Sequence, residues 1–220
     1  MDSLTFTDAH THHAYAHDSV LAIRNYPFFR LLGCLNLPIH SISGSFHPAY
    51  IPPGKTLALY QSASFWNHSS VRAVGECGLD TRQKSSIKQQ SEYLEQCCFI
   101  AQQHQLPLIL HTVKAYPETL HILSKYNVKF MFHQYSGTED FTKKALDKNA
   151  YFSFGFELLH KNRQERIKQI PPTNILLESD AVRKHVSHVF HMSAEILSIP
   201  LNTLTNQVLH NFTSFYSINA

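Results

Sequence analysis

Short apolar runs that end in a histidine or an acidic residue recur along almost the whole chain. These runs and motifs are Asp8-Ala9-His10-Thr11-His12, Gly75-Glu76-Cys77-Gly78-Leu79-Asp80, Leu106–Leu110 before His111, Val128–Phe132 before His133, and Asn174–Ser179 before Asp180. A parallel α/β barrel gathers the polar residues that follow its buried strands at one face. The pattern therefore predicts that these remote side chains converge.

The spacing of the apolar runs predicts a closed barrel of parallel strands. Eight candidate strands are Leu4–Asp8, Ser19–Arg24, Ile42–His47, Val71–Glu76, Pro107–His111, Val128–His133, Ala150–Phe154 and Asn174–Asp180. Runs of this length, bounded by turn residues, are typical of strands buried on both faces. We expect one domain over residues 1–220, an α/β fold of the TIM-like (β/α) barrel type. Because roughly 250 residues are typical of this fold, we expect reduced helices between the first three strands.

Helical patterns alternate with the later strands. Ser85 or Ser86 can cap the clearest one, in which Ile87, Leu94 and Ala101 fall on one face. Further helices are predicted at Pro117–Tyr126, Glu139–Lys148, Glu157–Gln169, Val189–Ser198 and Asn202–Ser214. The alternation of strands and helices favours a parallel sheet.

The residues at the strand ends have the chemistry of metal ligands. In an extended strand, His10 and His12 point the same way and can hold one cation, with Asp8 orienting an imidazole from behind. Buried carboxylates such as Glu76 are costly unless they are paired or bind metal. We expect His10, His12, Glu76 and Asp180 around one ion, and Glu76, His111 and His133 around a second.

The ligand set is mixed nitrogen and oxygen, which suits zinc, manganese or nickel and also admits magnesium. Two such ions can activate a water and stabilise a displacement at phosphorus. Asp180 and Glu76 are the predicted catalytic residues, Asp180 as the base that accepts a proton from the water. Glu178 is expected to be a structural partner, and Asp80 to brace a loop.

These motifs resemble the TatD family of metal-dependent hydrolases, which has a (β/α) barrel fold. The resemblance runs in order from Asp8 to Asp180, and Ser45-Phe46-His47-Pro48 and Asn211 are also similar to family motifs. It implies two-metal hydrolysis of phosphodiesters, often as a deoxyribonuclease or 3′–5′ exonuclease, and supports the six ligands named above. It also implies that Asp180 activates the water.

Two departures from the family pattern affect the expected substrate contacts. Val113 stands where relatives carry an arginine, and Ala181-Val182 replaces the usual Ala-Pro. We take Lys114, Arg183 and Lys184 as candidate substrate-binding residues beside the site. His47 is a weaker candidate for a substrate contact. The expected substrate is DNA or a small phosphodiester.

Composition sets limits on location and partners. The start of the chain has no basic segment followed by a long apolar one, and no stretch approaches the ~18 apolar residues of a membrane span. The four cysteines form no CxxC pair, which favours reduced thiols in the cytoplasm. The net charge of +3 is mild, and neither a membrane association nor an obligate protein partner is indicated.

Two other functions fit part of the pattern. An amidohydrolase-like enzyme acting on esters, lactones or amides shares the barrel and the HxH motif, although many such enzymes bridge their metals with a modified lysine where this chain offers Glu76. A non-catalytic barrel that binds nucleic acid or protein is the other, but the mild net charge argues against a dedicated nucleic-acid binder.

Overall fold

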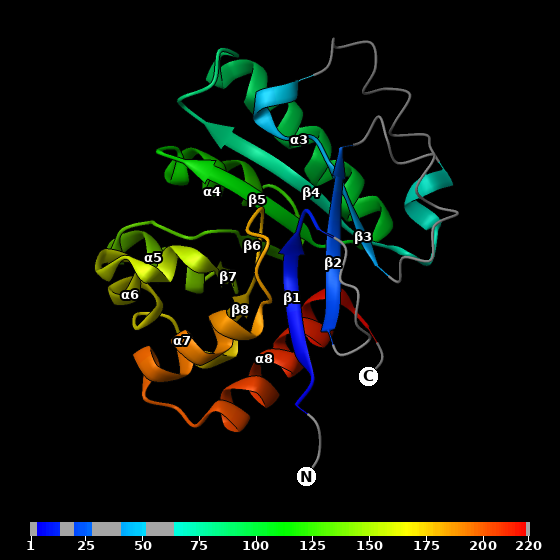
Figure 1. Cartoon of the computed structure of the whole chain (residues 1–220). Helices are drawn as coiled ribbons and strands as arrows, with labels where there is room; N and C mark the ends of the chain where they lie inside the picture. The colour runs from blue at the N-terminus through cyan, green and yellow to red at the C-terminus, as the bar shows by residue number, and fades with distance from the viewer. Residues whose placement is uncertain (1–3, 14–19, 28–40, 52–63, 219–220) are drawn as a thin grey trace. The chain divides into compact units, whose positions relative to one another are not determined.

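All eight predicted strands are present in the computed structural model, which describes residues 4–13, 20–27, 41–51 and 64–218 (Figure 1). The strands are β1 (Phe6–Thr11), β2 (Val20–Pro27), β3 (Ile42–Ser45), β4 (Val71–Asp80), β5 (Leu108–Val113), β6 (Phe130–Phe132), β7 (Tyr151–Phe154) and β8 (Ile175–Leu177). Their order in the sheet is their order in the sequence. This succession of parallel strands with intervening helices is that of a TIM-like barrel, so the predicted fold class is confirmed.

The chain divides into two compact units, and the first comprises residues 1–24 and 132–220. Within it β1 pairs in parallel with β2, and β7 with β8. The residue Asp180, just after β8, bridges to β1: its N–H donates to His10 O at 3.0 Å, and its carbonyl accepts the His12 N–H at 3.0 Å. This register fixes the backbone of Asp180 beside His10 and His12.

The second unit comprises residues 25–131 and contains the parallel pairs β3–β4 and β4–β5. The two glycines of the Gly75–Asp80 motif allow β4 to approach β5. Gly75 and Gly78 have φ of +142° and +143°, and a Cβ on Gly78 would lie 2.1 Å from the His111 carbonyl oxygen. Only glycine tolerates both the backbone angle and the close approach. The motif therefore extends β4 past Glu76 as far as Asp80.

Helix α3 (Ile87–His104) confirms the clearest helical prediction. Ser86 is its N-cap, and its hydroxyl accepts the Gln89 N–H while the Gln89 side chain accepts the Ser86 N–H. Gln105 ends the helix in the left-handed conformation. Leu94, Cys97, Cys98 and Ala101 are fully buried on the face that packs on β4 and β5. The amphipathic pattern thus predicted the covering helix and its buried face.

The remaining helices lie close to their predicted positions. They are α4 (Tyr116–Leu123), α5 (Glu139–Leu146), α6 (Lys161–Ile167), α7 (Ser187–Leu197) and α8 (Leu201–Tyr216). The single helix predicted at Glu157–Gln169 is divided into a 3-10 turn, Phe156–Leu159, and α6. His160, with extended φ and ψ of −96° and 127°, separates the two. In the first unit α8 packs on β1 and β8, and the Tyr216 hydroxyl donates to Ala9 O.

Some predictions concern residues outside the described ranges. The expectation of reduced early helices falls on residues 14–19 and 28–40, and Cys34 also lies there. Among the described cysteines, Cys77, Cys97 and Cys98 are buried free thiols. Across the described residues, none of the helices combines the length and the apolar character that a membrane span requires.

Candidate metal centre

In the first unit, His10 in β1 and His12, one residue past its end, lie side by side, as the strand alternation predicted. Their ring centroids are 5.1 Å apart. Oδ1 of Asp180 lies 3.6 Å from Nε2 of His10 and 3.3 Å from Nε2 of His12. The His10 side chain is fully buried, whereas the His12 side chain is 36% exposed. A carboxylate between two imidazoles is an arrangement that can hold a cation.

His133, directly after β6, joins this group. Its ring centroid lies 5.0 Å from that of His10, and one ligand atom each of His10, His133 and Asp180 lie within 4.8 Å of one another. The sequence had placed His133 with Glu76 and His111 around the other ion. Within its own unit, the structure groups His133 with His10 and Asp180.

Glu178 orients His133 from behind. Its Oε1 lies 3.4 Å from Nδ1 of His133 and accepts the Gln134 N–H at 3.1 Å, and its Oε2 accepts the Ser153 hydroxyl at 2.5 Å. A carboxylate at Nδ1 favours the proton there and leaves Nε2 as the ligand nitrogen. Glu178 is fully buried. It therefore has the structural role that the sequence suggested.

Two further contacts in the first unit fix the backbone and the side chain of the residues after β8. Asp8 is fully buried, and its Oδ1 accepts the Ser179 N–H at 2.9 Å. Asp180 itself has a φ of +51°, and the Gln134 amide donates to its Oδ2. Asp8 thus holds the backbone at Ser179, after β8. The imidazole-orienting role predicted for Asp8 stays a prediction.

In the second unit, Glu76 is buried within β4 and is oriented by a short chain of hydrogen bonds. Its Oε2 accepts the Asn25 amide at 3.0 Å, and Asn25 Oδ1 accepts the Ser43 hydroxyl at 3.1 Å. Its Oε1 lies 3.6 Å from Nδ1 of His111. The amide contact on one oxygen fixes the other toward the imidazole, as a metal ligand requires.

Asp80 orients His111 as Glu178 orients His133. Its Oδ2 lies 3.2 Å from Nε2 of His111, and its carboxylate also accepts hydrogen bonds from the Arg82 backbone, the Arg82 guanidinium and the Gln83 amide. Burial alone would raise the pKa of Asp80, but the hydrogen bonds from Arg82 and Gln83 hold that pKa well below its usual value. Asp80 is thus a charged carboxylate that braces its loop, as predicted, and leaves Nδ1 of His111 to act as the ligand nitrogen.

His47, after β3, is a functional candidate whose position beside Glu76 and His111 its local sequence does not reveal. Its ring centroid lies 4.2 Å from that of His111, and ligand atoms of His47, Glu76 and His111 lie within 4.8 Å of one another. The only signal for it was the turn motif Ser45–Pro48. Its neighbours Glu76 and His111 come from remote parts of the sequence, so their proximity could not be read from local spacing.

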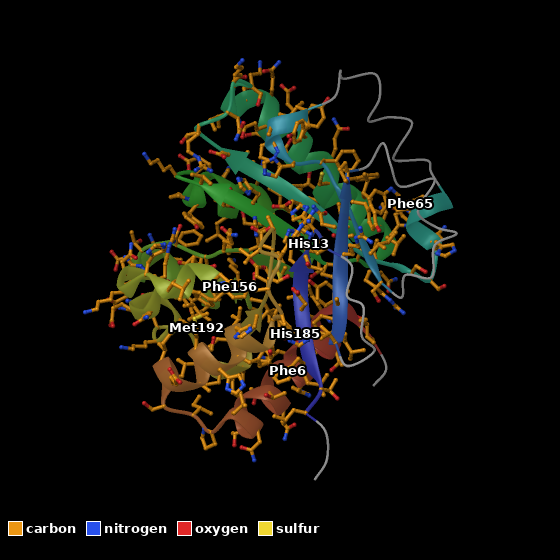
Figure 2. All side chains as sticks on the ribbon, viewed as in Figure 1. Phe6, His13, Phe65, Phe156, His185 and Met192 are labelled. Carbon is orange, nitrogen blue, oxygen red and sulfur yellow. The ribbon has the colours of Figure 1, made fainter. Side chains whose placement is uncertain are left out.

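Two of the histidines that the sequence set aside, His13 and His185, make contacts away from the two ligand groups. A ring nitrogen of His13 lies 2.7 Å from the Ala181 carbonyl oxygen, and His185 accepts the Ser187 N–H at the start of α7. Both side chains are labelled in Figure 2. The His185 ring also lies edge-on to Phe6, 6.2 Å away. Neither residue belongs to a ligand group among the described residues.

The predicted substrate-binding residues are at the ends of their strands. Lys114 is exposed directly after β5, and Arg183 and Lys184 are exposed after β8. Nζ of Lys184 lies 6.0 Å from the centroid of the Phe156 ring. The exposed positions leave these basic groups accessible to an anionic ligand, and their role stays a prediction.

Each unit thus carries a group of three imidazole or carboxylate side chains whose potential ligand atoms lie within 4.8 Å of one another. In each unit one imidazole has a carboxylate at one of its nitrogens: Glu178 lies at Nδ1 of His133, and Asp80 lies at Nε2 of His111. This arrangement is frequent at metal sites. The donor chemistry fits a divalent transition metal such as zinc or manganese. A barrel with such groups at its strand ends belongs to the class of metal-dependent hydrolases.

Comparison with known proteins identifies the family. The family model described as TatD related DNase matches residues 38–217, and the chain belongs to this family. A putative deoxyribonuclease TATDN1 homolog from Vairimorpha ceranae is 28% identical over 178 residues, covering 68% of this chain and 67% of that protein. The uncharacterized metal-dependent hydrolase YabD of Bacillus subtilis is 25% identical over 172 residues, covering 69% and 68%. The predicted family and hydrolase class are therefore confirmed.

Solved structures confirm the fold. YJJV, a TatD homolog from Escherichia coli K12, superposes with a TM-score of 0.85 over 98% of this chain and 99% of that chain, at 18% identity. A hydrolase of the TatD family from Entamoeba histolytica superposes with a TM-score of 0.75 over 99% of each chain. Because the sequence identity is this low, the superposition shows that the barrel fold is shared.

Proposed function

We propose that this protein is a divalent-metal phosphodiesterase that cleaves nucleic-acid ends, with Asp180 as general base. The relatives support the substrate class. A 3′-5′ ssDNA/RNA exonuclease TatD from Citrobacter koseri is 29% identical over 119 residues, half of this chain and 46% of that protein. We propose that both units act together as one catalytic domain spanning residues 1–220, that the substrate is a DNA end or a small phosphodiester, and that the enzyme works in the cytoplasm.

The observation that carries the proposal is the repeated carboxylate–imidazole pair behind each ligand group. His133 has Glu178 at its Nδ1, and His111 has Asp80 at its Nε2. Holding several further carboxylates and imidazoles beside these pairs in a buried place is costly without a cation. The same pairs increase the basicity of the opposite ring nitrogen toward a metal.

The proposed ligands are His10, His12, Glu76, His111, His133 and Asp180. Two divalent ions, when bound, would lower the pKa of a water and stabilise charge that develops at phosphorus. Asn25 and Ser43 hold Glu76 in a fixed orientation, and Asp80 and Glu178 fix the imidazole tautomers. We assign the proton-accepting role to the Asp180 carboxylate, whose Oδ2 accepts a hydrogen bond from the Gln134 amide. Zinc, manganese, magnesium and nickel are the candidate metals.

The proposal is tested by metal binding and turnover together. We expect the purified chain to take up divalent ions and to hydrolyse 3′-ended oligonucleotides or bis(p-nitrophenyl) phosphate in their presence. Asp180→Asn should keep a ligand oxygen but lose at least about 100-fold in turnover, because general-base catalysis typically contributes 10²–10⁴-fold. Asp140→Asn, at an exposed position in α5, is the matched control and should be unchanged.

Three results would contradict the proposal in different ways. Near-wild-type turnover by Asp180→Asn refutes its assignment as the base. Hydrolysis of a carboxylic ester or lactone without hydrolysis of any phosphodiester would instead favour the amidohydrolase-like alternative. A chain that takes up neither manganese nor zinc at neutral pH would favour a non-catalytic binding role.

A further inference from the structure

His47 belongs to a turn that fixes the state of its imidazole. It is the N-cap of the 3-10 turn Pro48–Tyr50, and its Nδ1 accepts the Ala49 N–H at 3.0 Å. An imidazole nitrogen that accepts a backbone N–H carries no proton. In the neutral ring the proton is therefore on Nε2, which becomes a hydrogen-bond donor.

This tautomer argues against His47 as a third metal ligand beside Glu76 and His111. A neutral imidazole that binds metal through one nitrogen carries its proton on the other, which then donates, usually to a carboxylate or a carbonyl. His111 has this pattern, with Asp80 facing its Nε2. His47 has the opposite pattern, because a donor faces its Nδ1. Although its ligand atom lies within 4.8 Å of those of Glu76 and His111, His47 is suited to donate to an anion held there.

Tyr50 belongs to the same turn and exposes a large aromatic surface. The residue is 75% exposed, its N–H donates to the His47 carbonyl at 2.8 Å, and its ring centroid lies 6.2 Å from that of His47. A single exposed tyrosine is ordinary, but this one is held beside a donor at the candidate metal group. Exposed aromatic rings beside phosphate-binding groups are the usual platforms for nucleobases in single strands.

We propose that His47 and Tyr50 form a nucleotide subsite, in which His47 Nε2–H donates to a phosphate oxygen and the Tyr50 ring stacks on the attached base. This inference rests on the proposed function and narrows its substrate to a nucleotide-bearing phosphodiester. The two residues are separated by one turn, so one local structure would recognise both the phosphate and the base. His47 is in this view a substrate-binding residue rather than a ligand.

The histidine is tested with two substitutions that each retain half of its hydrogen bonding. In His47→Asn the amide oxygen takes the place of Nδ1 and can still cap the turn, but the distal donor is lost. In His47→Gln the distal N–H is retained and the cap is lost. Calorimetry on the full-length chain would measure the affinity first for Mn²⁺ alone, then for inorganic phosphate and thymidine 5′-monophosphate in the presence of Mn²⁺.

We expect His47→Asn to bind Mn²⁺ within twofold of the wild type and to bind both phosphate compounds about tenfold more weakly, the usual effect of losing a hydrogen bond to a charged group. His47→Gln should lose less. A loss of Mn²⁺ affinity as large as that of His111→Asn would show that His47 is a ligand. Unchanged affinity for phosphate would show that it only caps the turn. Either result overturns the proposal.

Tyr50 is tested with the same probes. Tyr50→Ala should weaken binding of thymidine 5′-monophosphate about fivefold, the lower end of the range for base stacking, and leave inorganic phosphate unchanged. Tyr50→Phe, which keeps the ring, should match the wild type. Equal affinity of Tyr50→Ala and the wild type for the nucleotide would refute the stacking role, as would an equal weakening of inorganic phosphate binding.

These binding measurements are separate from turnover. If the His47 and Tyr50 variants show the expected affinities but the wild type hydrolyses no phosphodiester, the proposed function is contradicted and the subsite is retained. If the wild type hydrolyses phosphodiesters but its affinity for phosphate and nucleotide depends on neither His47 nor Tyr50, the subsite is refuted and the proposed function is retained. A wild-type chain that binds neither phosphate compound would overturn the subsite.

Discussion

Replacement of Glu157 by glutamine should stabilise the protein at alkaline pH and have a much smaller effect under acidic conditions. Glu157 lies just after β7, and its Oε1 accepts the Gly155 N–H at 2.8 Å. Its Oε2 is buried and has no hydrogen-bond partner among the described residues. Burial, together with the nearby charge of Glu178, raises the pKa of Glu157 from 4.5 to about 7, and the Gly155 N–H and Arg163 offset only part of this.

The raised pKa of Glu157 makes the folded state less stable at high pH than at low pH. Because the folded state retains a proton that the unfolded chain releases above about pH 4.5, folding becomes less favourable as the pH rises from there to about 7, and no further loss follows above it. A shift from 4.5 to about 7 corresponds to a penalty of about 1 kcal/mol at pH 5 and about 3 kcal/mol at pH 8. Glu157→Gln removes this penalty.

The assay is urea unfolding of the metal-free wild type and variant at pH 5 and pH 8. The stability of Glu157→Gln relative to the wild type should increase by about 2 kcal/mol between the two conditions. Other titrating groups are common to both proteins and cancel. Glu165→Gln, an exposed position on α6, is the control and should show no such increase. Parallel pH profiles for Glu157→Gln and the wild type would refute the buried, protonated state of this carboxyl.

Two further predictions concern the second unit. Asp80→Asn should cost roughly 1–3 kcal/mol of stability at pH 7 and weaken metal binding about tenfold or more, because it removes the charged acceptor that orients His111. Since the pKa of Asp80 is lowered, the stability difference between the variant and the wild type should shrink as the pH falls below about 3.8. Urea unfolding and metal titrations would measure the two effects. An unchanged metal affinity would contradict the orienting role. Gly78→Ala should destabilise the chain by more than about 3 kcal/mol, because the added Cβ would lie 2.1 Å from the His111 carbonyl oxygen at a φ of +143°, and a melting temperature like that of the wild type would contradict the close approach.

Local sequence determined the strands, most helices and most of the ligand candidates. Each buried strand is an apolar run of its own, and a run that is apolar on both faces predicts burial without knowledge of its partners. The cap of α3 needs only Ser86 and Gln89, which are three residues apart. The shared direction of His10 and His12 follows from the alternation of one strand. These features depend on residues within one element, so the local amino-acid sequence was sufficient to predict them.

Tertiary structure decided which partner each of these residues has. Glu178 faces His133 across 45 residues of sequence, Asp80 faces His111 across 31, and Asn25 faces Glu76 across 51. Such pairs depend on the register between strands, which is fixed by hydrogen bonds and close packing between distant segments rather than by the pattern within either. The place of His47 beside His111 has the same origin. The residue types of the chain determined its chemistry, and the register of the strands determined which atom of each side chain is available to perform it.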